Sequence, residues 1–320
     1  MFFTEEFMRS AFITLGFVLV LVGASVPSLT LRAQQGPPTG VPVHLVVTVE
    51  ARHGKDVPVI HREDVMAYQG KERGTVTDWL PLQGDHAGLD FFVLLDDASS
   101  TSLGSQLEDL RQFILGQPAT TSIGVGYMRD GTVDIVQNLT TDHAAAAKSL
   151  RLPFGSTGAI ASPYFSVVDL LKRWPESAVR REILMVSDGI DRYGGGGPAE
   201  DPYVNSAVEA AQKAGVIIFA IYATGVGHWG HSLWRMNWGQ NYLAQVADET
   251  GGEAYFLGFG TPVSFSPYLD DLSHRLNQQY LLTFLAKAEK KAGLQEVKLR
   301  TEAPNAELVS ADRVWVPAAM

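Results

Sequence analysis

Oxygen-bearing side chains follow two of the most apolar runs of this sequence. The apolar run Phe91–Leu95 is followed by Asp97, Ser99 and Thr101, and a second apolar run is followed by Asp188. Both runs are short and partly β-branched, as buried parallel strands are. Because ligands bind beyond the carboxyl ends of such strands, the sequence predicts that these oxygens converge at one edge of a sheet. Carboxylates and hydroxyl groups together suit a small divalent cation.

Strands and helices alternate along the chain from residue 89 to about residue 280. Apolar strands are predicted over residues 121–127, 183–186 and 216–222, with amphipathic helices between them. Alternation of this kind is typical of βαβ units, which build a parallel sheet with helices on both faces. The predicted fold class is therefore α/β, with a doubly wound, mainly parallel sheet.

Both ends of the chain contain further predicted strands outside this alternation. Residues 43–88 and 281–317 hold short runs of apolar and polar residues, and each end is too small to fold alone. We expect the two ends to pack together as one small β subdomain beside an α/β domain that spans residues 89–280. Residues 34–42 are rich in proline and glycine and are predicted to be a linker.

Composition excludes several classes of protein. The 320 residues carry a formal net charge of −10, and no basic cluster stands out, so binding to nucleic acid is not expected. Because the chain has no cysteine, it can form neither a disulfide nor a thiolate metal site, and it has no thiol nucleophile. A hydrophobic fraction of 46% is enough for a sizeable core.

The first 33 residues resemble a secretory signal peptide. Residues 10–31 are uncharged, Pro27 interrupts the apolar segment, and Ala33 precedes the expected cleavage site. We therefore expect a secreted or periplasmic protein whose mature form begins near Gln34, which an intact-mass measurement would show. The alternative is an uncleaved membrane anchor formed by residues 10–31.

The oxygen-rich loops resemble the metal-ion-dependent adhesion site of von Willebrand factor type A (VWA) domains. In that family an Asp-x-Ser-x-Ser motif follows the first strand, a Thr lies in a second loop, and an Asp lies in a Thr-Asp-Gly-like turn. Asp97-x-Ser99-x-Thr101 resembles the first motif, and Ser187-Asp188-Gly189 resembles the third. Over residues 42–317 the chain is similar to the secreted VWA-related proteins of acidobacteria. The resemblance implies a VWA or Rossmann-like fold that binds Mg²⁺, with Mn²⁺ or Ca²⁺ as alternatives.

The resemblance also indicates which residues would hold the metal. Ser162-Pro163-Tyr164 is similar to the family's Thr-Pro-Leu segment, which favours Ser162 over Thr157 as the second-loop ligand. In the first loop Asp97 is preferred to Asp96, because only Asp97 has hydroxyl groups two and four positions later. The competing interpretation is that the two aspartates only cap helices or turns. The expected ligands are Asp97, Ser99, Thr101, Ser162 and Asp188.

The function that follows is an exported, non-enzymatic protein-binding module. Two carboxylates and neutral hydroxyl groups leave Mg²⁺ electrophilic, so the ion can accept an acidic side chain from a partner protein. One alternative is a degenerate VWA fold with a structural role in the cell envelope. The other is a secreted hydrolase that uses the same metal, although the sequence shows no evident general base and no Gly-x-Ser-x-Gly motif.

A tryptophan-rich segment, Gly225–Trp238, leaves the carboxyl end of the predicted strand 216–222. The segment is predicted to be irregular and contains Trp229 and Trp234. Because tryptophan is enriched at interface hot spots, we expect this segment to rim the metal and to supply partner specificity. The alternative is that its tryptophans fold inward. Its Gly-x-Gly-x-x-Gly sequence matches a dinucleotide fingerprint by chance, since no helix of small apolar residues follows.

Overall fold

The chain folds around two β-sheets of different kinds. The computed structural model describes residues 40–156, 162–193, 201–227, 232–255, 258 and 260–319. The predicted signal peptide, residues 34–39 of the predicted linker, Thr157 and Trp229 lie outside these ranges. Pro38–Met320 forms one unit that contains both sheets. Within the described ranges, no helix combines the length and the apolar character needed to cross a membrane.

A six-stranded sheet forms the centre of the α/β part. The strand order is β6-β5-β4-β7-β8-β9, in which β6 is antiparallel to β5 and the other neighbours are parallel. Three central strands, β4, β7 and β8, are buried along nearly their whole length, as parallel strands covered on both faces are. The strands are β4 (Leu89–Asp96), β5 (Thr121–Arg129), β6 (Thr132–Thr140), β7 (Arg180–Ser187), β8 (Val216–Tyr222) and β9 (Ala254–Tyr255).

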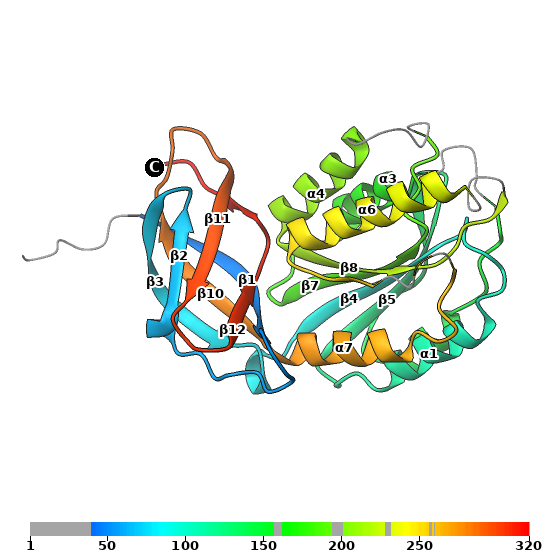
Figure 1. The fold of residues 1–320 in the computed structure, drawn as a ribbon, viewed down its shortest axis with the longest axis horizontal. Helices are drawn as coiled ribbons and strands as arrows, with labels where there is room; N and C mark the ends of the chain where they lie inside the picture. The colour runs from blue at the N-terminus through cyan, green and yellow to red at the C-terminus, as the bar shows by residue number, and fades with distance from the viewer. Residues whose placement is uncertain are drawn as a thin grey trace, which may run out of the picture. The chain divides into compact units, whose positions relative to one another are not determined.

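Helices cover both faces of this sheet (Figure 1). On one face α1, α2 and α7 pack around Phe91, Val93 and Leu95. On the other face α3, α4 and α6 pack around Phe92 and Leu94, because successive strand residues point to opposite sides. This is the doubly wound α/β class that the sequence predicts. The helices are α1 (Gly104–Leu115), α2 (His143–Ser149), α3 (Pro163–Arg173), α4 (Pro202–Ala214), α6 (Leu233–Thr250) and α7 (Ser266–Asn277).

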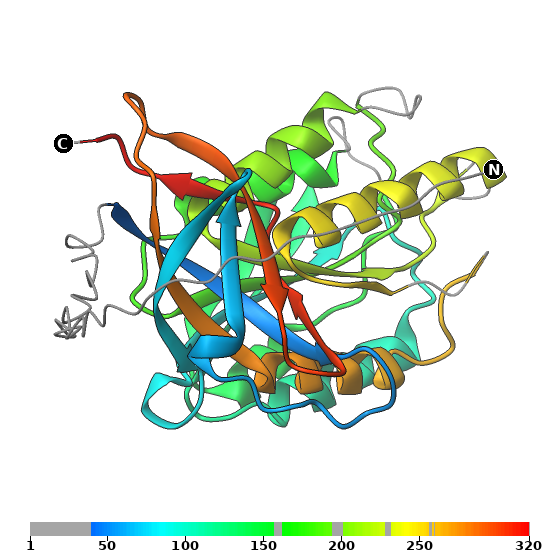
Figure 2. The same ribbon diagram turned by 60° about the vertical axis from the view of Figure 1, so that its left-hand side comes forward.

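The second sheet is antiparallel and draws its seven strands from both ends of the described chain (Figure 2). Its order is β12-β1-β10-β3-β2-β11-β13. Since β12 also contacts β11 and β1 contacts β13, the sheet curves around an apolar core of its own. The strands are β1 (Val41–Ala51), β2 (Val65–Gln69), β3 (Glu72–Pro81), β10 (Gln279–Ala286), β11 (Gly293–Thr301), β12 (Ala306–Val309) and β13 (Arg313–Val316).

One local feature differs from the sequence prediction. The segment Gly225–Trp238 is not irregular throughout, because α6 already begins at Leu233 and Met236 packs into the core. Strands β2 and β12 are short and of mixed polarity, so pairing with neighbouring strands rather than sequence pattern specifies them. A tight hairpin turn joins β5 and β6, with Asp130 and Gly131 both at positive φ.

Candidate functional site

The loops after β4 and β8 are hydrogen-bonded to each other at the carboxyl edge of the six-stranded sheet. Ser100 N donates to the carbonyl oxygen of Thr224 at 2.8 Å, and Val226 N donates to that of Ala98 at 2.8 Å. The tryptophan-rich segment therefore begins directly beside the first oxygen-rich loop, as the sequence predicts. We call the loops that follow β4, β7 and β8, together with residues 151–156, the loop edge.

Asp97 is buried in the loop edge and forms an ion pair with Arg151. The two guanidinium nitrogens Nη1 and Nη2 donate to its two oxygens at 2.7 and 3.0 Å, and Phe154 N donates at 3.2 Å. The guanidinium carbon of Arg151 lies 3.6 Å from the ring centre of Tyr127 and 3.8 Å from that of Phe154. Bidentate pairing thus engages the oxygens that a metal would need, and the two cation–π contacts hold the guanidinium in place.

Asp188 is paired in a similar way with Arg192. Arg192 Nη2 donates to Oδ2, Nη1 donates to Oδ1 at 3.2 Å, and Ile190 N donates to Oδ1 at 3.0 Å. Both partners are buried, with side chains 1% and 7% exposed. A glycine at position 225 makes this pair possible, because a Cβ there would lie 1.8 Å from Asp188 Oδ2 and 2.5 Å from Arg192 Nη2.

Asp96 is the carboxylate that lies beside Asp188. Its Oδ2 accepts a hydrogen bond from Ser187 Oγ at 2.7 Å, and its Oδ1 accepts one from Ala98 N at 2.8 Å. Burial first, and the nearby charge of Asp188 second, raise the pKa of Asp96 to about 6, while Arg192 opposes the shift. The structure therefore brings Asp188 together with Asp96, the alternative first-loop residue, and directs Asp97 towards Arg151.

The hydroxyl groups of the predicted site differ in their surroundings. Ser162 caps α3, since its Oγ accepts from Phe165 N at 3.3 Å and donates to Asp191 at 3.0 Å. Ser99 is buried, and among the described residues its Oγ has no hydrogen-bond partner. Thr101 is exposed. The hydroxyl of Ser162 is thus already used by a helix cap, and that of Ser99 is the one still open to a ligand.

The carboxylates and hydroxyl groups of the loop edge are not placed to hold a hydrated Mg²⁺. Magnesium requires octahedral oxygen ligation and usually keeps several waters. The cavity lined by Asp96, Ser162 and Arg192 has a volume of about 10 Å³, which is room for about one water. The positive charge beside Asp96 and Asp188 is supplied by the Arg192 guanidinium. Within the described ranges, no three carboxylate or imidazole groups are placed as metal ligands.

The arginines that neutralise Asp97 and Asp188 are not among the site residues predicted from the sequence. Arg192 lies four positions after Asp188, and this close spacing of opposite charges is a signal that could have been read. Arg151 is 54 positions from Asp97, so only the fold brings the two together. Asp191 is fully buried and accepts from Ser162, although nothing in the sequence distinguishes it from a surface aspartate.

Exposed apolar side chains gather around the loop edge. Trp234 at the start of α6 is 77% exposed, and Phe154 beside Asp97 is 57% exposed. Tyr193, the neighbour of Arg192, is 53% exposed. Trp238, in contrast, is half-buried against the core formed with α3 and α4, and Trp229 lies outside the described residues. Apolar side chains gathered at one end of a soluble fold are typical of an interaction surface.

Comparisons with known proteins give distant similarities. No protein-family model matches the chain, and no curated protein matches it. A von Willebrand factor type A structure from Catenulispora acidiphila is 9% identical with a TM-score of 0.45, over 88% of this chain and 74% of that one. The ArnB paralog VWA2 from Sulfolobus acidocaldarius is 11% identical with a TM-score of 0.39, and the match covers 87% of this chain and 76% of that one. An aerotolerance-related membrane protein from Bacteroides fragilis is 14% identical with a TM-score of 0.41, and the match covers 59% of this chain and 99% of that one. At these TM-scores the similarities do not assign the chain to a family.

Proposed function

We propose that the chain is a VWA-type protein-interaction module that binds a partner protein at the loop edge without a divalent ion. The observation that carries the proposal is the presence of exposed apolar side chains, among them Trp234 and Phe154, on the loops that hold a carboxylate cluster whose cation is Arg192. Tryptophan and tyrosine are the side chains most enriched at interface hot spots, together with arginine. The resemblance to secreted VWA-related proteins supports the same assignment.

The internal arginines explain how such an edge keeps its shape without a metal. A divalent ion would join separate loops by binding oxygens from each of them. Here Arg151 joins residues 151–154 to the loop after β4, and Arg192 neutralises the carboxylates after β4 and β7. Because these contacts lie within the chain, the partner-binding surface forms independently of divalent ions.

The burial of the carboxylates supports a non-enzymatic role. Asp96, Asp97 and Asp188 are 5%, 1% and 1% exposed, and the two last are held in ion pairs. A general base must reach a proton of the substrate, which a carboxylate enclosed in this way does not. We therefore propose binding rather than hydrolysis.

Magnesium-dependent binding is a second candidate, favoured by one observation. The buried Oγ of Ser99 has no hydrogen-bond partner among the described residues, and a metal would supply one. In that case Arg192 would release Asp188, and the ion would accept an acidic side chain of the partner. Export with cleavage after Ala33 stays a prediction, because residues 1–39 lie outside the described ranges.

Capture of partner proteins from envelope extract tests the proposal. The wild-type chain is expected to retain the same partner in EDTA and in MgCl₂. Replacement of the exposed Trp234 (Trp234→Ala) is expected to weaken binding by about tenfold or more, as loss of a hot spot does. A matched control is Leu115→Ala, since Leu115 is 48% exposed at the far end of α1 and should be neutral. Retention only in MgCl₂ would establish the second candidate, and equal retention by Trp234→Ala would remove the loop edge as the binding surface.

A further inference from the structure

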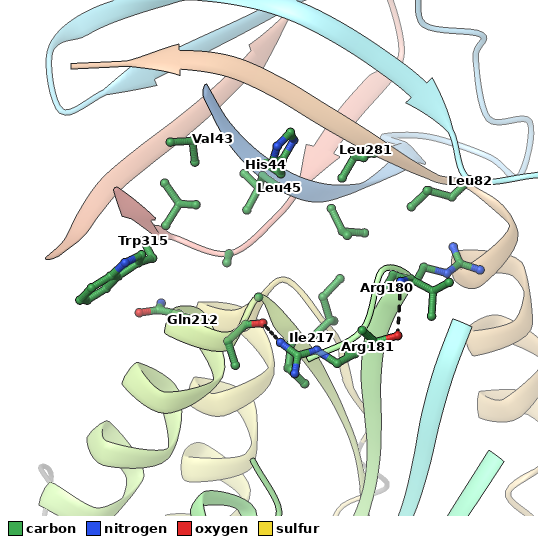
Figure 3. Close-up of a pocket in the computed structure, with 18 of the residues that line it drawn as sticks. Val43, His44, Leu45, Leu82, Arg180, Arg181, Gln212, Ile217, Leu281 and Trp315 are labelled. Atoms are coloured by element: carbon green, nitrogen blue, oxygen red, sulfur yellow. Dashed lines mark hydrogen bonds between the residues drawn. The ribbon is translucent and has the colours of Figure 1, made fainter. Parts of the chain in front are cut away.

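A second concave site lies at the amino ends of β7 and β8 (Figure 3). The cavity has a volume of about 730 Å³, which is within the range of small-molecule sites. Residues from β1, β10 and β13 line one side, and the amino ends of β7 and β8 with the end of α4 line the other. Because Asp188 follows the carboxyl end of β7, this cavity is separate from the loop edge.

The walls of the cavity are largely apolar. Leu45, Leu82 and Ile217 line it, and they are 8%, 8% and 4% exposed. Figure 3 shows Leu45 and Leu281 on one side and Ile217 on the other. An acyl chain placed between these side chains would be removed from water, which is favourable for each methylene group that is buried.

Two cations on the lining of the cavity lack carboxylate partners. The guanidinium of Arg181 donates to the carbonyl oxygens of Ala214 and Pro175, and Lys213 Nζ lies 4.7 Å from the ring centre of Trp315. Among the described residues neither cation forms an ion pair within 4 Å. Two further cations on the lining, Arg180 and Arg313, each lie within 4 Å of a glutamate.

The balance of charge at the cavity is opposite to that of the whole chain. Asp85 is the one acidic residue among the described residues of the lining, whereas the chain as a whole has a net charge of −10. Glu176 and Asp90 act on Arg181 from outside the lining. Such a local excess of positive charge beside apolar walls favours a ligand that is apolar at one end and anionic at the other.

Gln212 adds a hydrogen-bond acceptor to the same lining. Its side chain is 3% exposed, and Nε2 donates to the carbonyl oxygen of Glu249 at 2.7 Å. Among the described residues Oε1 has no partner. A buried acceptor without a donor is costly, so a ligand hydroxyl that donates to it would be stabilised.

From these features we propose that the cavity binds a lipid with one acyl chain and an anionic head group that also carries a hydroxyl, as lysophosphatidic acid does. The acyl chain lies between Leu45 and Ile217. The phosphate lies between Arg181 and Lys213, and the hydroxyl donates to Gln212 Oε1. This inference is independent of the proposed protein-binding function, because the two sites share no residue.

Titration of the wild-type chain with oleoyl lysophosphatidic acid below its micelle concentration tests the proposal. Saturable binding is expected, and the charge reversal Lys213→Glu is expected to weaken it by about tenfold, as loss of a hydrogen bond to a charged group does. Lys213 is exposed, so the variant should fold, which its melting temperature checks. The matched control is Lys172→Glu on α3, which is exposed, does not line the cavity and should bind like wild type.

Two related lipids separate the contributions of charge and hydroxyl. Monoolein has the chain and hydroxyls without the charge, and it is expected to bind about tenfold more weakly. Oleate has the charge without the hydroxyl, and equal affinity for oleate would contradict the role given to Gln212. The proposal as a whole is overturned by absence of saturable binding, by equal affinity for monoolein, or by unchanged binding of Lys213→Glu relative to Lys172→Glu.

Discussion

Asp97 links two segments of the loop edge through a single side chain. Its carboxylate joins the end of β4 to Arg151 and Phe154, and its main-chain oxygen accepts from Ser156 N at 3.0 Å. With an exposed fraction of 1%, it is not the solvent-exposed ligand that a metal site would offer. Loss of one partner from a buried ion pair leaves the other charge uncompensated, which is costly.

We therefore expect Asp97→Asn to lower the free energy of unfolding by about 2–3 kcal/mol. This value is near the lower end of the range for broken buried ion pairs, because the side chain of Arg151 is 28% exposed and water screens the charge. Urea denaturation of the variant and of wild type measures the difference. Glu108→Gln, which removes an exposed pair with Arg111, serves as the control and should change little. An Asp97→Asn protein as stable as wild type would show that the pair with Arg151 contributes nothing to stability.

Strand β7 places an ionisable residue in the buried part of the six-stranded sheet. Glu182 is fully buried, and Arg180 Nε lies 3.8 Å from its Oε1. Burial raises the pKa of Glu182 to about 7, and the charge of Arg180 only partly offsets this effect. The folded protein therefore keeps a proton on Glu182 at pH values where the unfolded chain has already lost it.

Because the folded protein holds this proton more tightly than the unfolded chain does, its free energy of unfolding falls as the pH rises. The stability contribution of the protonated carboxyl is fully present below about pH 4.5 and is lost as the pH rises to about 7, by an amount on the order of 3 kcal/mol. Glu182→Gln cannot lose a proton, so its free energy of unfolding should exceed that of wild type by more at pH 8 than at pH 5. Urea denaturation at both pH values measures this difference. A stability difference between Glu182→Gln and wild type that does not change with pH would contradict the raised pKa of Glu182.

Elements with strong local signals could be predicted from the sequence. Asp201-Pro202 indicates the start of α4, and the structure begins this helix at Pro202 with Asp201 accepting from Tyr203 N. Gly215 ends it at a positive φ of 65°. The start of α6 at Leu233 could not be predicted, because the pattern of Trp, His and Gly before it has no helical period and tertiary packing determines the boundary.

At the scale of the whole molecule, the place of the candidate site could be predicted and its content could not. The carboxyl edge of a parallel sheet collects loops from distant parts of any chain, so the loops that hold Ser99 and Asp188 meet there, but the carboxylate beside Asp188 is Asp96 and not the preferred Asp97. Oxygen-rich loops, however, suit a metal ion and a guanidinium equally well. Which cation they hold depends on Arg151 and Arg192, whose positions only the fold determines.

The central claim is that the loop edge needs no divalent ion because Arg192 already supplies the positive charge beside Asp96 and Asp188. Calorimetric titration with MgCl₂ tests it most directly. The wild-type chain is predicted to show no saturable heat at millimolar Mg²⁺. Arg192→Gln, which leaves two neighbouring carboxylates without their cation, is predicted to bind the ion. Saturable binding by wild type that is lost in Asp188→Ala would contradict the account and would identify this edge as a magnesium site.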